Sequence, residues 1–300
     1  MRMRTLVSML ALLGIAACGG GGNSPPSAGS APPPPNVPPS VGCTGHCATA
    51  SSFLRTADVQ QVIVQAVNEA QVQGAKATIA VVDRVGNVLG VYRMNGARAT
   101  VRIGTARGVS GGLEGLDVPA EFAAIAKAIT GAYLSSEGNA FSTRTASQIV
   151  QEHFNPGELN AAGGPLFGVQ VSQLPCSDFV SRAGVSIGPH RSPLGLSADP
   201  GGFPLYLAGT PVGGIGVAAD PDYTLDPNVT DHDRNLDELI AWAGTWTFAA
   251  PDSRRAERIT AAGRNLRFSD IDFSDLGRDP ASAPQFANLG IGDGALIAVP

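Results

Sequence analysis

Apolar residues near the start of the folded region recur at intervals typical of one helix face. The positions are Val59, Ile63, Val67, Ala70 and Val72. The preceding stretch Thr56-Ala57-Asp58 offers side-chain oxygens for an N-cap, and Gly74 can adopt the left-handed conformation that ends many helices. The pattern predicts a helix over 57–73.

Two pairs of short apolar runs are separated by residues that favour turns. Residues 77–82 (ATIAVV) and 88–94 (VLGVYRM) flank the turn-forming stretch DRVGN. Residues 203–207 and 212–218 flank Ala-Gly-Thr-Pro in the same way. Each pair predicts a β-hairpin.

Three further segments have helical character. The Ala-rich segment 120–134 carries Phe, Ile, Ile and Tyr at helical spacing, and a shorter helix is predicted over 143–153. A last helix is predicted over 231–248, with Thr230 or Asp231 as its N-cap.

The first residues have the pattern of an export signal. Two arginines precede an apolar run at 6–15, which is about half of the ~20 residues that a membrane-spanning helix needs. Ile-Ala-Ala-Cys at 15–18 matches a bacterial lipobox. We therefore expect 1–18 to be a lipoprotein signal peptide and the mature protein to begin at a lipidated Cys18; the alternative is a plain cleaved secretion signal.

The segment that follows Cys18 is almost free of apolar side chains. Gly, Ser and Pro dominate it, so it cannot bury enough surface to offset the entropy of ordering, and 19–52 is predicted to be a disordered tether. Gly19, with no Asp beside the cysteine, resembles the outer-membrane sorting pattern of Gram-negative lipoproteins. We expect an exported protein anchored in the outer membrane that faces the periplasm or the cell surface.

The charge balance argues against a nucleic-acid partner. The formal net charge is −5, and Lys and Arg form no clusters, so the electrostatic footprint of a nucleic-acid-binding protein is missing. No segment after residue 18 has the length and apolarity of a membrane span. The expected contact with the membrane is the lipid anchor alone.

Three cysteines remain once Cys18 is lipidated, namely Cys43, Cys47 and Cys176. The first two flank His46 in CTGHC, but a structural zinc site needs four ligands and no second pair follows. The order of residues also excludes a C-x-x-C-H haem attachment site. An oxidising compartment favours one disulfide, formed either by Cys176 with one of the pair or within the pair itself.

Three blocks of the sequence resemble one known family. They are IAVVDRVGNVLGVYRMNGA at 79–97, AIAKAITGAYLSS at 124–136 and GGFPLYLAGTPVGGIGV at 201–217. In this order, and followed by a helix from Asp231, they resemble the GlcG/HbpS family of small haem-binding proteins, whose domain also occurs at the C-terminus of PduO-type cobalamin adenosyltransferases. The resemblance implies an α+β fold, with an antiparallel β-sheet packed with α-helices, and assembly into a homo-oligomer. It also implies that the ligand is haem or a related tetrapyrrole.

The resemblance covers a single domain at 53–248 and leaves two additions. One is a long Gly/Pro-rich insertion at about 137–200, and the other is a C-terminal extension at 249–300. Both can reshape a pocket. Two alternatives to a binding protein stay open at this point: an enzyme that uses the insertion as an active-site lid, and an assembly or sensor module without a ligand.

A haem site needs an apolar slot, one or two axial ligands, and cations or hydroxyls for the propionates. The matching blocks offer Lys127 and Thr130 in the Ala-rich helix, and Arg93, Met94 and Arg98 where the first hairpin ends. The resemblance implies that Thr130 contacts haem. The alternative is a hydroxyl bonded back to its own helix backbone.

Histidine is the commoner axial ligand, and the chain has four. If the insertion builds a pocket, His153 and His190 are the candidates, whereas His46 and His232 lie outside it. The alternative for each of the four is a surface or capping role.

Several strings resemble catalytic or metal-binding motifs without their context. GVSGG at 108–112 matches G-x-S-x-G but lacks the flanking strand and helix, and the glycines at 213–216 lie too late in the chain for a dinucleotide fingerprint. Cys176 would need a nearby base to act as a nucleophile. The acidic groups at 220–233 and 270–275 lack EF-hand spacing, so we expect solvated turn residues there. The sequence assigns no catalytic residue and no metal ligand.

Overall fold

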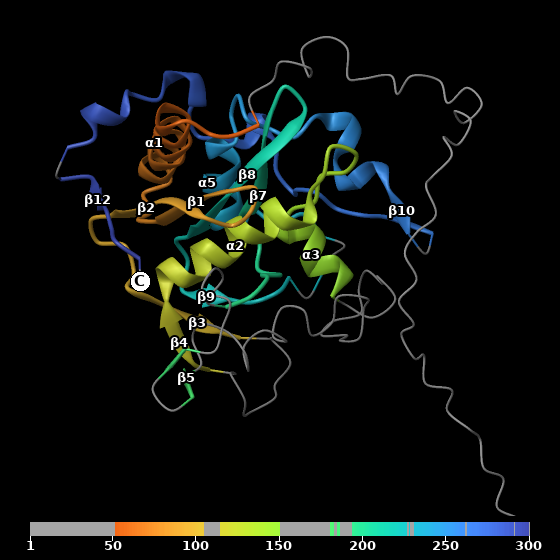
Figure 1. The fold of residues 1–300 in the computed structure, drawn as a ribbon, viewed down its shortest axis with the longest axis horizontal. Helices are drawn as coiled ribbons and strands as arrows, with labels where there is room; N and C mark the ends of the chain where they lie inside the picture. The colour runs from red at the N-terminus through yellow and green to blue at the C-terminus, as the bar shows by residue number, and fades with distance from the viewer. Residues whose placement is uncertain are drawn as a thin grey trace, which may run out of the picture. The chain divides into compact units, whose positions relative to one another are not determined.

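A five-stranded sheet, ordered β12-β2-β1-β8-β7, forms the centre of the fold (Figure 1). All of its neighbouring strands are antiparallel. The strands are β1 (Thr78–Asp83), β2 (Val88–Met94), β7 (Gly202–Leu207), β8 (Thr210–Ala218) and β12 (Gly294–Leu296). This architecture is the α+β class, with helices packed on an antiparallel sheet, that the resemblance implied.

The computed structural model describes residues 52–104, 115–150, 181–182, 185–186, 194–226, 228, 231–261, 263–290 and 292–299. The predicted signal peptide and most of the predicted tether lie outside these residues. No helix among the described ranges combines the length and the apolarity that crossing a bilayer requires.

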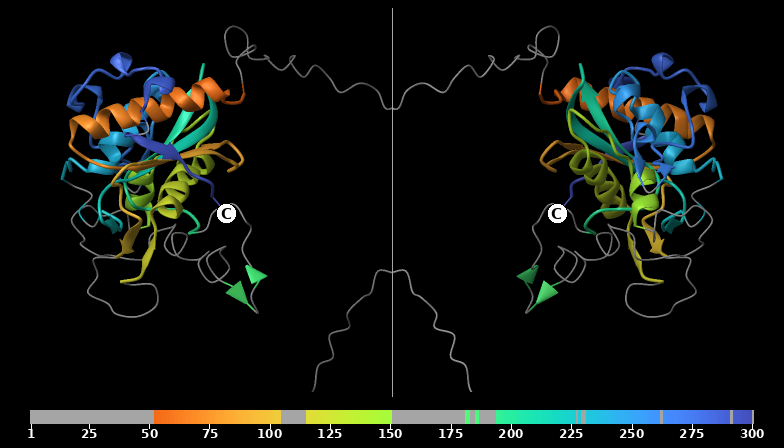
Figure 2. Two further views of the ribbon diagram at one scale, coloured as in Figure 1. Left: turned by 90° about the vertical axis from the view of Figure 1, so that its left-hand side faces the viewer. Right: turned by 90° about the vertical axis from the view of Figure 1, so that its right-hand side faces the viewer.

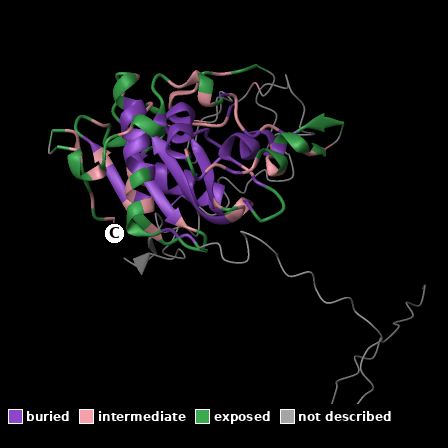
Figure 3. Cartoon of the chain, turned by 90° about the horizontal axis from the view of Figure 1, so that it is seen from above, coloured by how far each residue is buried: buried purple, intermediate pink, exposed green. Residues whose placement is uncertain are grey.

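Helices cover both faces of the sheet. Helices α1 (Thr56–Val72) and α5 (Leu236–Gly244) pack on one face, and α2 (Ala120–Leu134) packs on the other (Figure 2). A short helix, α3 (Thr143–Ile149), contacts α2 and β7. Viewed from above, the inner strands of the central sheet and the helix segments that face them are buried, and exposed residues lie on the outer helix faces, the loops and some short peripheral strands (Figure 3).

Strand β1 shows how the sequence produces these layers. Ile79 and Val81 belong to the core that α1 and α5 cover, whereas Ala80 and Val82 belong to the core around α2. Successive side chains of a strand point to opposite faces, so a continuous apolar run is suited to a strand that is covered on both sides.

Small residues bring α2 very close to β8. A Cβ atom at Gly214 would lie 2.1 Å from the backbone oxygen of Ala128, and one at Gly216 would lie 2.1 Å from that of Ala124. A side chain at either position would therefore push the helix off the sheet. The small residues of the Ala-rich helix α2 and of the VGGIGV segment of β8 together allow this close packing.

Smaller elements surround this centre. A three-stranded sheet is formed by β3 (Thr100–Ile103), which is antiparallel to β4 (Asp117–Pro119) and parallel to β9 (Asp222–Tyr223). Two short pairs are β5 (Ser181–Arg182) with β6 (Val185–Ser186), and β10 (Thr260–Ala261) with β11 (Arg264–Asn265). The 3-10 helices are η4 (Asp252–Arg254), η5 (Ala256–Arg258), η6 (Phe273–Asp275), η7 (Pro280–Ser282) and η8 (Phe286–Asn288).

The last predicted helix is too long at both ends. Helix α5 begins at Leu236, and its N-cap is Asn235, whose side chain accepts a hydrogen bond from the N–H of Glu238 at 2.9 Å. The prediction of Thr230 or Asp231 as the N-cap is therefore wrong. The preceding residues are held elsewhere, since the N–H of Asp233 donates to Oδ2 of Asp270. Beyond α5, Thr247 has a φ of 69°, which is incompatible with a continuing helix.

The residues of the predicted C-terminal extension take part in the same sheet and core. Strand β12 pairs with β2, so that Leu296 lies opposite Tyr92. Leu266, Phe268 and Ile271 are buried in the core that α1 and α5 cover. This segment closes one edge of the sheet and one side of the core.

Candidate functional site

Lys127 of α2 is fully buried in an ionic cluster. Its Nζ lies 2.7 Å from Oδ2 of Asp199 and 2.6 Å from Oδ2 of Asp237, and both carboxylates are buried. Burial alone lowers the pKa of Lys127, but Asp199, Asp237 and Asp220 outweigh it and raise the pKa above its usual value. Lys127 is thus a charged group inside the protein, neutralised by carboxylates from two other segments.

The carboxylates of this cluster hold more negative charge than one lysine can balance. Burial raises the pKa of Asp199 well above its usual value, against the opposing effect of Lys127. Burial, followed by the charge of Asp237, raises the pKa of Asp220 to about 6. The side chain of Asp237 is fixed by the backbone, because its Oδ1 accepts hydrogen bonds from the N–H groups of Ala219 at 2.7 Å and Asp220 at 3.1 Å.

Thr130 lies one turn further along α2 and is also fully buried. Its hydroxyl donates to the backbone oxygen of Ala126 at 2.7 Å, which is the back-bonded arrangement considered as the alternative. The same oxygen accepts from the N–H of Ser197 at 2.7 Å. Thr130 therefore attaches the segment before β7 to α2, and its predicted contact with haem stays a prediction.

The residues at the end of the first hairpin separate into interior and surface positions. Met94 is 1 % exposed, and its sulfur accepts from the N–H of Ala77 at 3.4 Å. Arg93 pairs with Glu121 of α2. Arg98 is exposed. Lys127 and Met94 already have partners inside the protein, so their contacts give no support for direct contact of either side chain with haem. Arg98, in contrast, lies on the surface, where a ligand can reach it.

Several predicted residues lie outside the described part of the chain. They are Cys18, Cys43, Cys47, His153, Cys176 and His190, together with the GVSGG string. The lipidation, the disulfide and the axial ligands stay predictions. His232 is described and is exposed, ahead of the first turn of α5.

A second buried ionic cluster surrounds Arg144 of α3. Its guanidinium lies 2.6 Å from Glu238, 2.8 Å from Asp226, 3.2 Å from Asp270 and 3.4 Å from Asp233. Burial alone lowers the pKa of Arg144, but the charge and hydrogen bond of Glu238, together with the charges of Asp226 and Asp233, outweigh it and raise the pKa. No motif in the sequence marks Arg144, and the signal that could have found it is the number of acidic residues in the loops that meet here.

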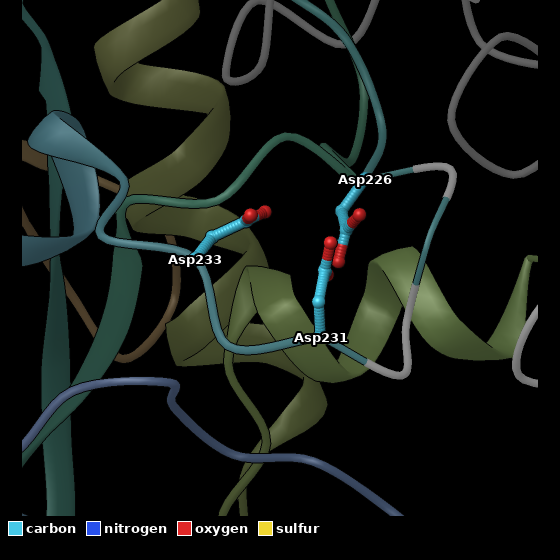
Figure 4. A group of neighbouring side chains, drawn as sticks. All are labelled: Asp226, Asp231 and Asp233. Carbon is cyan, nitrogen blue, oxygen red and sulfur yellow. The ribbon is translucent and has the colours of Figure 1, made fainter.

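The acidic loop of 220–233 contributes to this cluster. Carboxylate oxygens of Asp226, Asp231 and Asp233 all lie within 4.8 Å of one another, and the side chains of Asp226 and Asp231 point toward each other with Asp233 beside them (Figure 4). Asp226 is 6 % exposed and pairs with Arg144, and the Asp270 side chain is fully buried. The expectation of solvated turn residues is wrong for these two, because Arg144, which is distant in the sequence, pairs with both inside the protein.

Comparisons with known proteins identify similar solved structures. No family model matches the chain, and no curated protein matches it. A "PduOC:Heme Complex" structure is 20 % identical, with a TM-score of 0.40, and the match covers 65 % of this chain and 94 % of that one. The Klebsiella pneumoniae protein ORFY, described as DUF336, is 18 % identical, with a TM-score of 0.38 and coverage of 66 % and 92 %.

Streptomyces reticuli HbpS, solved as a double mutant, is a further match. It is 22 % identical, with a TM-score of 0.33, and the match covers 71 % of this chain and 97 % of that one.

Proposed function

We propose that this protein binds haem or a related tetrapyrrole, and that it does so as a lipid-anchored protein of the bacterial envelope. The observation that carries the proposal is the assembly of the three resembling blocks into one unit. Strands β1 and β2 come from the first block, α2 from the second, and β7 and β8 from the third; β1 pairs directly with β8, and α2 packs on both. Blocks that are far apart in the sequence therefore form one continuous scaffold.

Within this scaffold, some of the candidate residues hold its parts together, and others would contact the ligand. Lys127 and Thr130 hold α2 and the segment before β7 in place. Arg98 lies on the surface at the end of the first block and supplies a cation for a propionate. His153 or His190 would supply the nitrogen ligand to the iron of a bound haem.

A hemin titration of the purified full chain tests the proposal. We expect a Soret band that shifts on binding and saturates at a fixed stoichiometry. The variants His153→Ala and His190→Ala separate the two axial candidates, since loss of the ligand changes the band position, and His232→Ala is the matched control on an exposed histidine. An unchanged hemin spectrum with the wild-type chain would overturn the proposal.

The anchor is tested separately. Expression of the full chain with a labelled fatty acid is expected to label the wild type and leave the Cys18→Ser variant unlabelled and released from the membrane fraction. Cys176→Ser is the matched control and is expected to remain labelled. Sedimentation velocity with and without hemin tests the proposed homo-oligomer.

A further inference from the structure

A cavity of about 570 Å³ lies between α1, the turn that follows α5, and the C-terminal segment around η7 and η8. Its volume falls within the ~300–1,000 Å³ that is typical of small-molecule sites. Helix α1 contributes positions 57, 60, 61, 64 and 65, which share one helix face. The cavity is built partly from the C-terminal extension, so it is separate from the three blocks that resemble the haem-binding family.

The chemistry of the cavity wall is neutral. Among the described residues that line it, none has a charged side chain, and four are glutamines: Gln60, Gln61, Gln65 and Gln285. A charged ligand would lose its hydration here without gaining a counter-charge. An amide side chain both donates and accepts hydrogen bonds, as does a hydroxyl group.

Gln65 shows that the wall has unused hydrogen-bonding capacity. Its side chain is 2 % exposed, and its Oε1 accepts no hydrogen bond from any residue that the structure describes. A buried amide oxygen without a donor is unfavourable, and such groups are normally paired. Binding of a hydroxyl-bearing ligand, with the Gln65 amide turned so that this oxygen faces the cavity, would relieve the cost.

Thr247 is held at the edge of the cavity in an unusual conformation. Its φ of 69° lies in the left-handed region, which a β-branched residue rarely adopts. Gln61 of α1 donates through Nε2 to the Thr247 hydroxyl at 3.5 Å. Backbone strain of this kind is concentrated at binding and catalytic sites.

Two aromatic rings complete the wall. Trp246 packs edge-on against Phe273, with ring centroids 4.9 Å apart, and Phe286 packs edge-on against Tyr92, with centroids 6.0 Å apart. Both cavity rings are half-buried. Their partners fix the ring planes, and a ring held in this way offers an apolar surface to the C–H groups of a ligand.

We propose that this cavity binds a neutral, hydroxyl-rich ligand of mono- or disaccharide size. The glutamines and Thr247 match the hydroxyl groups of such a ligand, and Trp246 and Phe286 match the apolar face of its ring. A phosphate or carboxylate finds no cation on the wall, and an amine finds no anion, among the lining residues that the structure describes.

Tryptophan fluorescence tests the proposal directly. The chain has two tryptophans, of which Trp242 is buried and Trp246 lines the cavity. Titration of the full chain with glucose, N-acetylglucosamine, cellobiose or chitobiose is expected to shift the emission for at least one saccharide, and Trp246→Phe is expected to remove the shift. Gln65→Met is expected to weaken binding by about tenfold or more.

Control variants separate binding from folding. Gln71→Met removes an amide from the same helix outside the cavity and is expected to leave the saccharide affinity unchanged. Gln285→Ala alters an exposed lining residue and is expected to weaken binding without a change in the melting temperature. The proposal is overturned if none of the four saccharides binds at tens-of-millimolar concentrations. It is also overturned if glucose 6-phosphate or glucosamine binds as well as the neutral saccharides, or if natively folded Gln65→Met and Gln285→Ala both bind with wild-type affinity.

Discussion

The Nζ atom of Lys127 lies 2.6 Å from Oδ2 of Asp237, and both side chains are about 1 % exposed. The two residues come from α2 and α5, which cover opposite faces of the central sheet, so the ion pair connects the two layers of the core. Oδ1 of Asp237 also accepts hydrogen bonds from the N–H groups of Ala219 and Asp220, which directly follow β8. The first predictions test whether this connection is structural.

Removal of the buried cation is expected to destabilise the fold. Lys127→Met leaves Asp199 and Asp237 buried without their partner, and the free energy of unfolding is expected to fall by about 3–5 kcal/mol. Urea denaturation measures the loss. The matched control is Arg102→Met, because Arg102 pairs with Asp117 at 3.8 Å on an exposed surface, where ~0–1 kcal/mol is expected. Equal effects of the two variants would contradict a structural role for the Lys127 cluster.

The stability of the protein is expected to depend on Asp220 in weakly acidic solution. Its pKa is raised from 3.8 to about 6 in the fold, so between these values the folded state binds more protons than the unfolded state. The stabilising contribution of Asp220 to the free energy of unfolding is therefore fully present below pH 3.8 and is lost as the pH rises through about 6.

The matched variant is Asp220→Asn, which cannot titrate and keeps an oxygen for the N–H of Asp222. Thermal melts over this pH range are expected to show a flatter dependence for Asp220→Asn than for the wild type. Parallel curves for the two proteins would show that Asp220 does not carry the dependence.

The close approach of α2 to β8 predicts a large effect of a single methyl group. Gly216→Ala places a Cβ 2.1 Å from the backbone oxygen of Ala124, and the unfolding free energy is expected to fall by at least ~2 kcal/mol. Gly292→Ala is the control, since no atom lies within 4 Å of a Cβ built there. Native stability of Gly216→Ala would show that the helix and the strand can separate without cost.

The hydroxyl of Thr130 can be tested apart from its methyl group. Thr130→Val removes the acceptor of the buried Ser197 N–H and is expected to cost about 1–3 kcal/mol, whereas Thr130→Ser keeps the acceptor and is expected to cost less. Urea denaturation measures both. A hemin titration of the same two variants shows whether the hydroxyl also acts in binding, because a stable variant with an altered Soret band would assign it that second role.

Local patterns predicted the scaffold well where neighbours in the sequence determine the structure. The predicted segments 88–94 and 120–134 coincide with β2 and α2. The helix predicted over 231–248 failed at both ends, since Asp233 and Thr247 are held by contacts with distant segments. Local spacing contains no information on such contacts.

The candidate sites show the same division. The block AIAKAITGAYLSS at 124–136 drew attention to Lys127 and Thr130 as candidate haem contacts, but their partners Asp199, Asp237 and Ser197 come from other parts of the chain. Arg144 was missed because an arginine in a short polar helix resembles any surface arginine. Gln65 was missed because it lies on the buried side of α1 beside the apolar stripe, and only the C-terminal segment packed nearby makes it a cavity residue.

The sequence by itself determined the two central hairpins, helices α1 and α2, and the glycines that allow α2 to lie against β8, because these depend on side-chain periodicity and size over a few residues. Only the tertiary structure decided that Lys127 meets Asp237 across 110 positions of sequence, and that residues 294–296 complete the sheet beside β2. The physical reason is that charge pairing and edge-strand pairing are set by which surfaces come together when the layers pack, and many pairings of the same residues are compatible with the same local pattern.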